Sequence, residues 1–408
     1  MHAHPTSTAA LTTDVAIVGG GVAGASLAAA LATAGLGVVV IEREARFRDR
    51  VRGEGIHPWG VLEADALGLL PTLRAAGAHE LPGWQVYRGR EPVYAFRWDD
   101  DAPGRPGEWS LYHPTLQTAL LEHAAACGAQ VLRPARVTDF TRQDGPRLTL
   151  ETADGARDLR ARLVVGADGR QSAARRWLGV EARHDAPLQQ IGGCLLDDVA
   201  LDQEQTHYAV FDGGFALLFP QGHGRARAYV ICGAELAAEL RGDSERFIGQ
   251  CAAALPQGAL GTARAVGPLA FFPAADIWCE RVAGAGVALL GDAAGANDPS
   301  RGQGLSICFR DARELRDALL HDSDWERALA SYAARRATYY AALRADAQWT
   351  ALLSSGVGPE SDARRARAER ARQLDPEVGG YGNIIGAGPD GLVVDEPTRR
   401  HYFGEDLL

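Results

Sequence analysis

IVGGGVAG, residues 17–24, decides the fold of this chain. A short β-branched run at 14–18 leads into it, and a helix of small residues is expected from 22 to 34. The run LGVVVIE, 36–42, then predicts a second strand. A strand, a glycine-rich turn, a helix and a second strand in this order predict the opening βαβ unit of a nucleotide-binding sheet.

The glycines of this turn have the GxGxxG spacing of a dinucleotide site. Gly19 permits a tight turn, Gly21 lets a pyrophosphate approach the backbone, and Gly24 lets helix and strand pack closely. Glu42 ends the second strand, where an acid binds a ribose hydroxyl. The motif does not separate NAD from FAD. The residues expected at the dinucleotide are Gly19, Gly21, Val22, Ala23, Gly24, Glu42 and Arg43.

The composition indicates a globular chain of more than one domain. Its 408 residues are 46% hydrophobic, and a net charge of -10 without a basic block argues against a nucleic-acid surface. The sequence has no run of 18 apolar residues, so we expect no membrane insertion. Six scattered cysteines lack metal-ligand spacing, so we expect no metal site and free thiols in the cytoplasm. Residues 1–12 are interpreted as a disordered tail.

Secondary-structure patterns change along the chain. PWGVLEADALGLL, 58–70, predicts one helix, and β-strands with turns dominate from about 186 to 273. Long helices are expected at 304–320 and 325–347, and a further helical stretch reaches about residue 374.

Two later segments each place an aspartate directly after a predicted buried strand. In VVGADGRQSAARRWLG, Asp168 and Gly169 could be an ordinary turn with a capped helix behind it. In GDAAGANDPSRGQG, residues 291–304, Asp292 could likewise form an Asx-type turn between a strand and a helix. Either segment alone leaves both a structural and a ligand-binding interpretation open.

We call residues 164–179 the DG segment and residues 291–304 the GD segment. Taken in order, the GxGxxG motif, the DG segment and the GD segment resemble those of the class A flavoprotein monooxygenases, the para-hydroxybenzoate hydroxylase-like family. The resemblance runs from Asp14 to Tyr340. It implies an α/β fold: a three-layer, glutathione-reductase-like FAD-binding domain, an inserted mixed β-sheet substrate domain and a helical C-terminal segment. The implied ranges are 13–75, 110–185 and 274–320 for the FAD-binding domain, 76–109 and 186–273 for the substrate domain, and 321–408 for the C-terminal segment and tail.

The resemblance also implies roles within the GD segment. Asp292 corresponds to the aspartate that hydrogen-bonds the ribityl chain of FAD, and the helix from Gly304 points its positive end at the flavin pyrimidine. The family pattern is GDAAHxxPPxxGQGxN, so Gly295 replaces His, Asp298 replaces the first Pro and Ser306 replaces Asn. The remaining residues implied to contact FAD are Pro299, Gly302, Gln303, Gly304, and the amides of Leu305 and Ser306. The resemblance also implies that the DG segment, Asp168 and Gly169, contributes to the FAD site and to the transient nicotinamide site.

Other site residues are assigned from the same resemblance. Arg52 matches the arginine at the FAD pyrophosphate, with Arg50 the less favoured choice, and His113 matches a polar contact to the phosphates or ribityl chain. Val137 matches a backbone contact to adenine, although a plain core strand residue fits it as well. His57 is a candidate proton relay, with a histidine at a helix entry as the alternative.

Aromatic residues of the 186–273 region could line an apolar pocket for a flat substrate or could form core. Strand alternation predicts that only half of them face inward. The residues concerned are Tyr208, Phe211, Phe215, Phe219 and Tyr229.

The implied function is an FAD-dependent monooxygenase that uses NADPH or NADH and O2. It would hydroxylate or epoxidise an aromatic or polyketide-like small molecule through a flavin hydroperoxide, acting as a monomer or homodimer. An FAD-dependent reductase or dehydrogenase, and a non-redox flavin isomerase or cyclase, remain alternatives. A flavin-dependent halogenase needs a lysine to carry the hypohalous equivalent, and this chain contains none.

Overall fold

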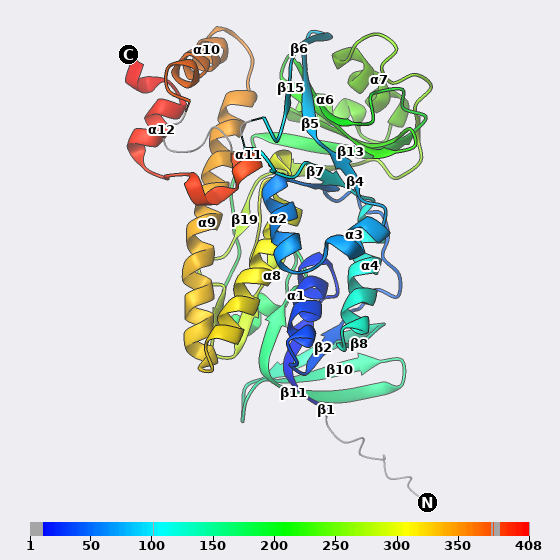
Figure 1. The fold of residues 1–408 in the computed structure, drawn as a ribbon, viewed down its shortest axis with the longest axis vertical. Helices are drawn as coiled ribbons and strands as arrows, with labels where there is room; N and C mark the ends of the chain where they lie inside the picture. Colours follow the sequence, from blue (N-terminus) through cyan, green and yellow to red (C-terminus); the bar gives the residue numbers. More distant parts are fainter. Residues whose placement is uncertain (1–10, 101, 377, 379–383, 408) are drawn as a thin grey trace, which may run out of the picture.

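A mostly parallel sheet forms the base of the molecule in Figure 1. The computed structural model describes residues 11–100, 102–376, 378 and 384–407. Strand β1 (Leu11–Val18) lies at the centre, paired in parallel with β2 (Val38–Ile41) on one side and β11 (Gly155–Gly166) on the other. The order β20-β21-β11-β1-β2-β8 completes this path, and β9 and β10 extend it beside β11. The added strands are β8 (Gln130–Leu132), β9 (Ala135–Thr141), β10 (Arg147–Thr152), β20 (Ala283–Gly284) and β21 (Val287–Leu289).

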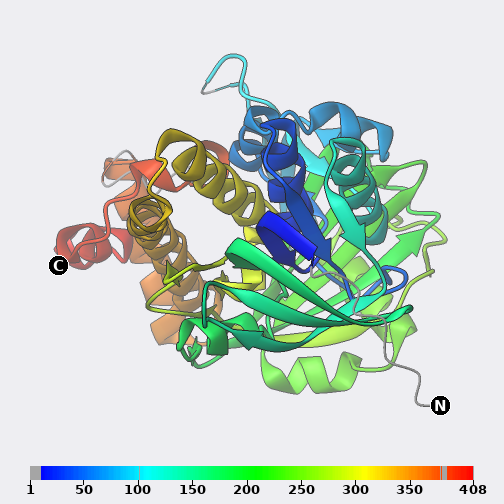
Figure 2. The same cartoon turned by 90° about the horizontal axis from the view of Figure 1, so that it is seen from below.

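Helices cover one face of this sheet. α1 (Val22–Thr33) packs between α4 (His113–Ala126) and α8 (Gly304–His321), as Figures 1 and 2 show. Ten of the twelve α1 residues are buried. Its alanines and glycine allow this because small side chains let neighbouring helices and the sheet approach closely. The glycine-rich loop before α1 is thereby held at the carboxyl edge of the sheet.

A second sheet of eight strands stands above the first. Its main path is β17-β13-β16-β15-β14-β5-β6, and the pairings are antiparallel except between β14 and β5. Helix α7 (Ser244–Ala254) packs its buried residues on the outer face of this sheet. The inner face, toward the first sheet and its helices, carries large aromatic side chains. Its strands are β5 (Gly83–Arg88), β6 (Glu91–Arg97), β13 (Gln189–Asp197), β14 (Gln205–Phe211), β15 (Gly214–Gly222), β16 (Arg225–Cys232), β17 (Arg264–Ala265) and β18 (Ala270–Ala274).

The C-terminal region is helical and packs along α8. α9 (Trp325–Ser354) is followed by α10 (Pro359–Leu374), α11 (Ile384–Ala387) and α12 (Glu396–Tyr402). Buried Arg336 of α9 donates from Nε to both carboxylate oxygens of Asp311 in α8, at 3.1 and 3.0 Å. Asp311 also accepts from the Gly291 amide at 2.7 Å, so both helices are tied to the GD segment.

The expected architecture is present: an α/β unit with a mostly parallel sheet, a mixed second sheet and C-terminal helices. Two details differ from the sequence predictions. Strand β1 already begins at Leu11, inside the stretch 1–12 interpreted as a tail, and residues 1–10 lie outside the described residues. The single helix expected at 58–70 is two, α2 (Pro58–Ala66) and α3 (Leu70–Ala75), because the chain turns at Gly68 with φ 72°.

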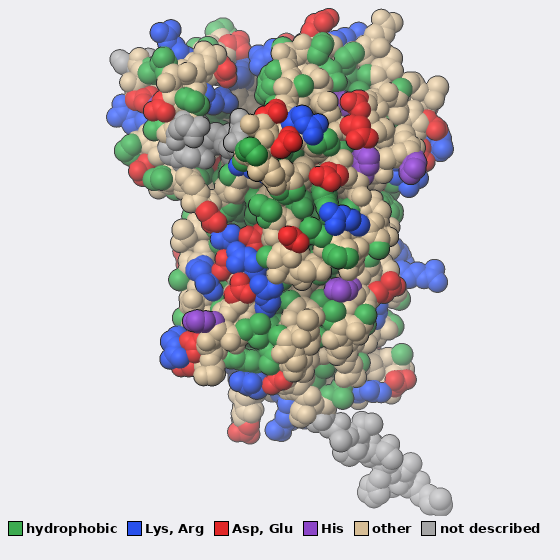
Figure 3. All heavy atoms as spheres, viewed as in Figure 1, with side chains coloured by type: hydrophobic (Ala, Val, Ile, Leu, Met, Phe, Trp, Pro, Cys, Tyr) green, Lys and Arg blue, Asp and Glu red, His purple; other side chains and the backbone are tan. Residues whose placement is uncertain are grey.

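Strands β5 and β6 of the second sheet lie in 76–109, and its other strands run from Gln189 to Ala274, one residue past the expected boundary at 273. The division into separate domains stays a prediction. On the face seen in Figure 3, acidic and basic side chains are interspersed among apolar ones.

Candidate functional site

The glycine-rich loop is shaped by close backbone packing. A Cβ at Gly24 would lie 2.0 Å from the Gly19 carbonyl oxygen, and one at Gly19, whose φ is 108°, would lie 2.3 Å from the Ala167 oxygen. Both positions therefore require glycine. At Gly21 the nearest atom to such a Cβ is Gln117 Nε2 at 3.5 Å. The N-terminus of α1 thus has the room that a phosphate needs.

Glu42 holds the same loop from the end of β2. It is buried, and its Oε2 accepts from the Gly20 amide at 2.7 Å while Oε1 accepts from the Glu44 amide at 2.7 Å. Each carboxylate oxygen has a further lone pair, so a ribose hydroxyl could still donate to it. Arg43 points to solvent beside Glu44 and is 65% exposed.

The DG and GD segments are joined by Arg175, whose role the sequence did not reveal. This buried guanidinium donates from Nε to the Ala293 oxygen at 2.9 Å and from Nη2 to the Asp292 oxygen at 2.8 Å. Asp168 accepts from the Ala173 and Ala174 amides at 2.6 and 3.3 Å and so caps α5 (Ala174–Leu178). The capped-turn interpretation of Asp168 is therefore met, and contact of Asp168 and Gly169 with a cofactor stays a prediction.

Arg52 and Asp292 lie next to each other near the N-terminus of α1, where Gly291 approaches Ala23. Arg52 Nη1 lies 3.5 Å from Asp292 Oδ2, and both side chains are partly exposed. Arg50 instead pairs with Glu44 at 2.8 Å, away from Asp292. This geometry favours Arg52 over Arg50 for a diphosphate, since an arginine fork suits that group.

His113 and Val137 occupy different surroundings. His113 Nδ1 is 2.8 Å from the Gly53 oxygen, next to Arg52, and burial lowers the pKa of His113. Val137 pairs with Leu150 in the β9–β10 ladder and is half-buried against a core cluster. The assignment of both residues to FAD stays a prediction.

A buried ion-pair network supports residues 51–57, which we call the Arg52 loop. Arg227 of β16 is fully buried and donates to Glu54 from Nε and Nη2 at 3.0 and 2.9 Å, and to Asp49 from Nη2 at 2.8 Å. Tyr229, two residues along the strand, donates from its hydroxyl to the Arg52 oxygen at 2.8 Å. The second sheet thereby fixes the backbone that carries the proposed pyrophosphate ligand.

The three residues that depart from the family pattern each lie in close local packing. A Cβ at Gly295 would lie 2.9 Å from the Tyr340 ring, so α9 fills the space of the usual side chain. Ser306 is buried against α2, where a Cβ at Gly60 would lie 2.1 Å from its Oγ. Asp298 accepts from the Ser300 amide at 2.9 Å and caps the short helix η2 (Pro299–Arg301).

A buried carboxylate pair underlies this loop. Asp276, just before β19 (Ile277–Trp278), accepts from Asn297 Nδ2 at 2.8 Å and from the Asp298 amide at 3.2 Å. Burial, and then the neighbouring Asp298 carboxylate, raise the pKa of Asp276 to about 7. Burial also raises the pKa of Asp298. Asp276 therefore keeps its proton at pH values where an ordinary aspartate has lost it.

The rest of the GD segment packs against α2. Gln303 is buried, and its Oε1 accepts from Trp59 Nε1 at 3.0 Å. A Cβ at Gly302, whose φ is 66°, would approach His57 Nε2 to 3.1 Å, whereas one at Gly304 would meet nothing within 4 Å. The N-terminus of α8, with the Leu305 and Ser306 amides in its first turn, thus begins at an unobstructed point.

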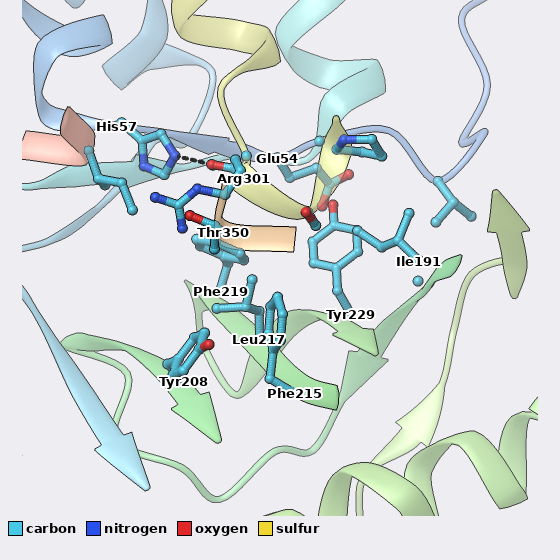
Figure 4. Close-up of a pocket in the computed structure, with 18 of the residues that line it drawn as sticks. Glu54, His57, Ile191, Tyr208, Phe215, Leu217, Phe219, Tyr229, Arg301 and Thr350 are labelled. Carbon is cyan, nitrogen blue, oxygen red and sulfur yellow. Dashed lines mark hydrogen bonds between the residues drawn. The ribbon is translucent and has the colours of Figure 1, made fainter. Parts of the chain in front are cut away.

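His57 lies between two acceptors. Its Nδ1 is 2.5 Å from Glu108 Oε1, and its Nε2 is 2.8 Å from the Arg301 carbonyl oxygen, the dashed line in Figure 4. Trp84 Nε1 and Thr206 Oγ1 donate to the other oxygen of Glu108 at 2.5 and 2.8 Å. The His57–Glu108 pair is fully enclosed, and neither Glu108 nor this pairing was expected from the sequence.

An apolar pocket opens beside this pair (Figure 4). Its walls come from the Arg52 loop, the inner face of the second sheet, the loop at 299–302 and the C-terminal region. The aromatic and aliphatic side chains that line it include Trp84, Ile191, Tyr208, Phe215, Leu217, Phe219, Tyr229 and Phe272. Thr350 and Ile385 contribute from the C-terminal region. Mostly apolar walls with a few polar groups are typical of a small-molecule site.

The expectation that half of the five aromatic residues face inward was wrong, since four of them line the pocket. The register explains this: Leu217 pairs with Tyr208 on one side and Tyr229 on the other, so all three share a face. Phe215 and Phe219 lie two residues either side of Leu217 and share it too. Phe211 packs on the outer face.

These residues fit FAD by their shape and donor chemistry. Glycines stand where a side chain would block the α1 and α8 N-termini, an arginine and an aspartate meet between them, and a pocket adjoins the loop at 299–302. Such a fold and site define a flavin-dependent oxidoreductase.

The comparisons with known proteins agree. The family model described as FAD binding domain matches residues 12–347, and the chain belongs to this family. It is an enzyme of the FAD-dependent monooxygenase class. The ubiquinone hydroxylase UbiL of Rhodospirillum rubrum is 30% identical over 89% of this chain and 87% of its own length. Rifampicin monooxygenase of Streptomyces venezuelae is 29% identical over 87% and 75%.

A solved structure gives the same result. PqsL, a probable FAD-dependent monooxygenase from Pseudomonas aeruginosa, superposes with a TM-score of 0.69 at 29% identity, over 83% of this chain and 96% of its own. Among the described residues, no helix has the length and apolar character needed to cross a membrane.

Replacing Asp292 by alanine is expected to yield folded protein with little bound FAD. The change removes a carboxylate acceptor and the partner of Arg52, and loss of one charged hydrogen bond weakens binding about 10-fold or more. The ratio of absorbance at 450 nm to that at 280 nm measures occupancy. The exposed helical Asp65→Ala variant is the control, and full flavin occupancy in Asp292→Ala would contradict the role given to Asp292.

Proposed function

We propose that this enzyme is an NAD(P)H-using, FAD-dependent monooxygenase that hydroxylates or epoxidises an aromatic or polyketide-like small molecule. The observation that carries the proposal is the aromatic pocket, which is bounded by the same loops that would hold the flavin, 51–57 and 299–302. Two relatives are named as a ubiquinone hydroxylase and a rifampicin monooxygenase, which supports oxygen insertion into ring compounds.

Bound FAD would supply the redox chemistry, reduced by NADH or NADPH and reacting with O2. The chain's own part is binding, orientation and exclusion of water. Arg52 and the α1 N-terminus would hold the diphosphate, while Asp292 and Glu42 accept from sugar hydroxyls. The N-terminus of α8 offers a positive end to the flavin ring without a charged side chain. The apolar walls keep bulk water from the reacting atoms.

The His57–Glu108 pair would manage a proton at the pocket wall. The Arg301 carbonyl can only accept, so His57 Nε2 must carry a hydrogen. On the other side, one proton is shared between Nδ1 and Glu108 Oε1. A ligand oxygen that replaces the Arg301 carbonyl could accept the hydrogen from His57 Nε2.

Oxygen consumption tests this function. The purified protein, reconstituted with FAD, is given NADH or NADPH under air with a panel of phenols, quinones and polyketide-like ring compounds. We expect one nucleotide to bleach the 450 nm band faster in the presence of a ligand, with one O2 consumed per hydroxylated product. Oxidation of the nicotinamide without O2 in the product would favour a reductase or dehydrogenase. Product without nucleotide use would favour an isomerase or cyclase.

A further inference from the structure

We propose that Arg301 is the specificity residue of the pocket, and that it binds an uncharged oxygen acceptor, a carbonyl or phenolic oxygen, on a flat ring substrate. This inference rests on the proposed function and adds the substrate class to it. Arg301 ends the short helix η2 and lines the pocket. Its guanidinium lies beside Thr350 on the side of the cavity nearest the C-terminal region (Figure 4).

The Arg301 guanidinium is bound to Asp346 along its Nε–Nη2 edge, and its Nη1–Nη2 edge faces away from Asp346. Arg301 donates from Nε and Nη2 to the two oxygens of Asp346 at 2.8 and 3.3 Å. Asp346 is on α9 and only 3% exposed, whereas the Arg301 side chain is 18% exposed. Nη1 has no hydrogen-bond partner among the residues that the structure describes. Because the planar group has a second fork formed by Nη1 and Nη2, this end can bind a ligand while Asp346 fixes the other.

The surroundings make that free donor significant. The cavity walls are mostly apolar, and Tyr208, whose pKa burial raises to about 12, lies near Arg301. The other polar group nearby, the Thr350 hydroxyl, already shares a hydrogen bond with the Tyr402 hydroxyl at 2.8 Å. A charged donor that faces an apolar cavity gains much from an acceptor that enters with the ligand. An oxygen on an otherwise apolar ring system is the group that meets this need.

The charges around the pocket decide which oxygen is preferred. Arg301 is neutralised by Asp346, Glu54 is paired with Arg227, and His57 is paired with Glu108. A carboxylate ligand would therefore bring an uncompensated negative charge into an enclosed, weakly polar site. A ketone, quinone or phenol brings an acceptor without a charge. The site thus selects uncharged oxygenated rings over ring carboxylates.

Calorimetric titration of the FAD-loaded protein with four matched probes tests this selection. The probes are naphthalene, 2-naphthol, 2-acetonaphthone and 2-naphthoate, which share one ring system. We expect 2-naphthol and 2-acetonaphthone to bind about 10-fold or more tightly than naphthalene, the effect of one hydrogen bond to a charged donor. We expect 2-naphthoate to bind more weakly than 2-acetonaphthone. Tightest binding by 2-naphthoate, or no binding by any probe, would overturn the inference.

Two variants attribute the selection to Arg301. Arg301→Lys keeps a cation beside Asp346 but removes the second fork, and the double variant Arg301→Gln/Asp346→Asn removes both charges together. Each is expected to reduce the preference for 2-acetonaphthone over naphthalene to less than about 3-fold. Arg344→Gln is the control, because Arg344 is also paired through α9, with Asp185, but does not line the pocket.

The flavin absorbance of each variant shows whether the neighbouring loop is intact. An unchanged preference in both Arg301 variants would overturn the inference. The outcome is separate from that of the proposed function. If the probes bind with the expected preference but no ligand supports NAD(P)H-dependent O2 use, the proposed function fails and the assignment of Arg301 stands.

Discussion

Replacing Arg227 by methionine is expected to lower the free energy of unfolding by about 3–5 kcal/mol, the usual effect of removing one partner from a buried ion pair. Glu54 is fully buried, and Asp49 is 8% exposed. Methionine fills much of the space but leaves both carboxylates without their cation. Urea unfolding followed by tryptophan fluorescence measures the change, and the loosened Arg52 loop should also weaken FAD binding.

Arg225→Met provides the matched control. Arg225 lies two residues before Arg227 in the same strand, and its Asp197 partner is on the molecular surface. Exposed pairs contribute about 1 kcal/mol or less, so this variant should remain close to the parent. Equal effects of the two substitutions would show that the buried network does not support the fold as described.

Asp276→Asn is expected to stabilise the protein at pH 8 by about 2–4 kcal/mol and to change stability little at pH 4. Because the folded-state pKa of about 7 lies above the ordinary 3.8, the folded chain keeps a proton that the unfolded chain releases. The stability that comes from the higher pKa of Asp276 in the folded state is fully present below pH 4 and is lost as the pH rises to 7. Asparagine can accept from Asn297 and the Asp298 amide without carrying a charge.

Urea unfolding between pH 4 and pH 8 checks this prediction. Asp185→Asn provides a comparison of opposite sign: although burial opposes it, the hydrogen bond and charge of Arg344 lower the pKa of Asp185. That carboxylate stabilises the fold above its unfolded-state pKa, so its replacement should cost stability at pH 8 and little at low pH. Parallel pH profiles for the parent and Asp276→Asn would contradict the assigned proton.

The sequence predicted the parts of the site that depend on neighbouring residues. The glycine-rich loop, the strand ends and the helix starts follow from local spacing, and the structure shows why Gly19 and Gly24 have no side chain. The paired charges could not be predicted in this way. His57 meets Glu108 across 51 residues, and Glu54 meets Arg227 across 173. Only the fold brings such partners together.

The aromatic wall shows the same limit at shorter range. Alternation along one strand is local, but which face of each strand meets its neighbour depends on register. Pairing of Leu217 with both Tyr208 and Tyr229 placed more aromatic residues inward than alternation alone predicts. Contact of Asp168, His113 and Val137 with FAD stays a prediction for the same reason, since each needs the cofactor's position as well as the chain's.

The pocket wall includes residues that lie outside the matched FAD binding domain. The family match ends at residue 347, whereas Thr350 and Ile385 line the cavity. The dinucleotide loops and the GD segment all lie before that point. Substitutions at Thr350 or Ile385 would therefore change the shape of the cavity without changing the residues proposed to hold the flavin. In this architecture, the residues that would set ligand preference differ in part from those that would bind FAD.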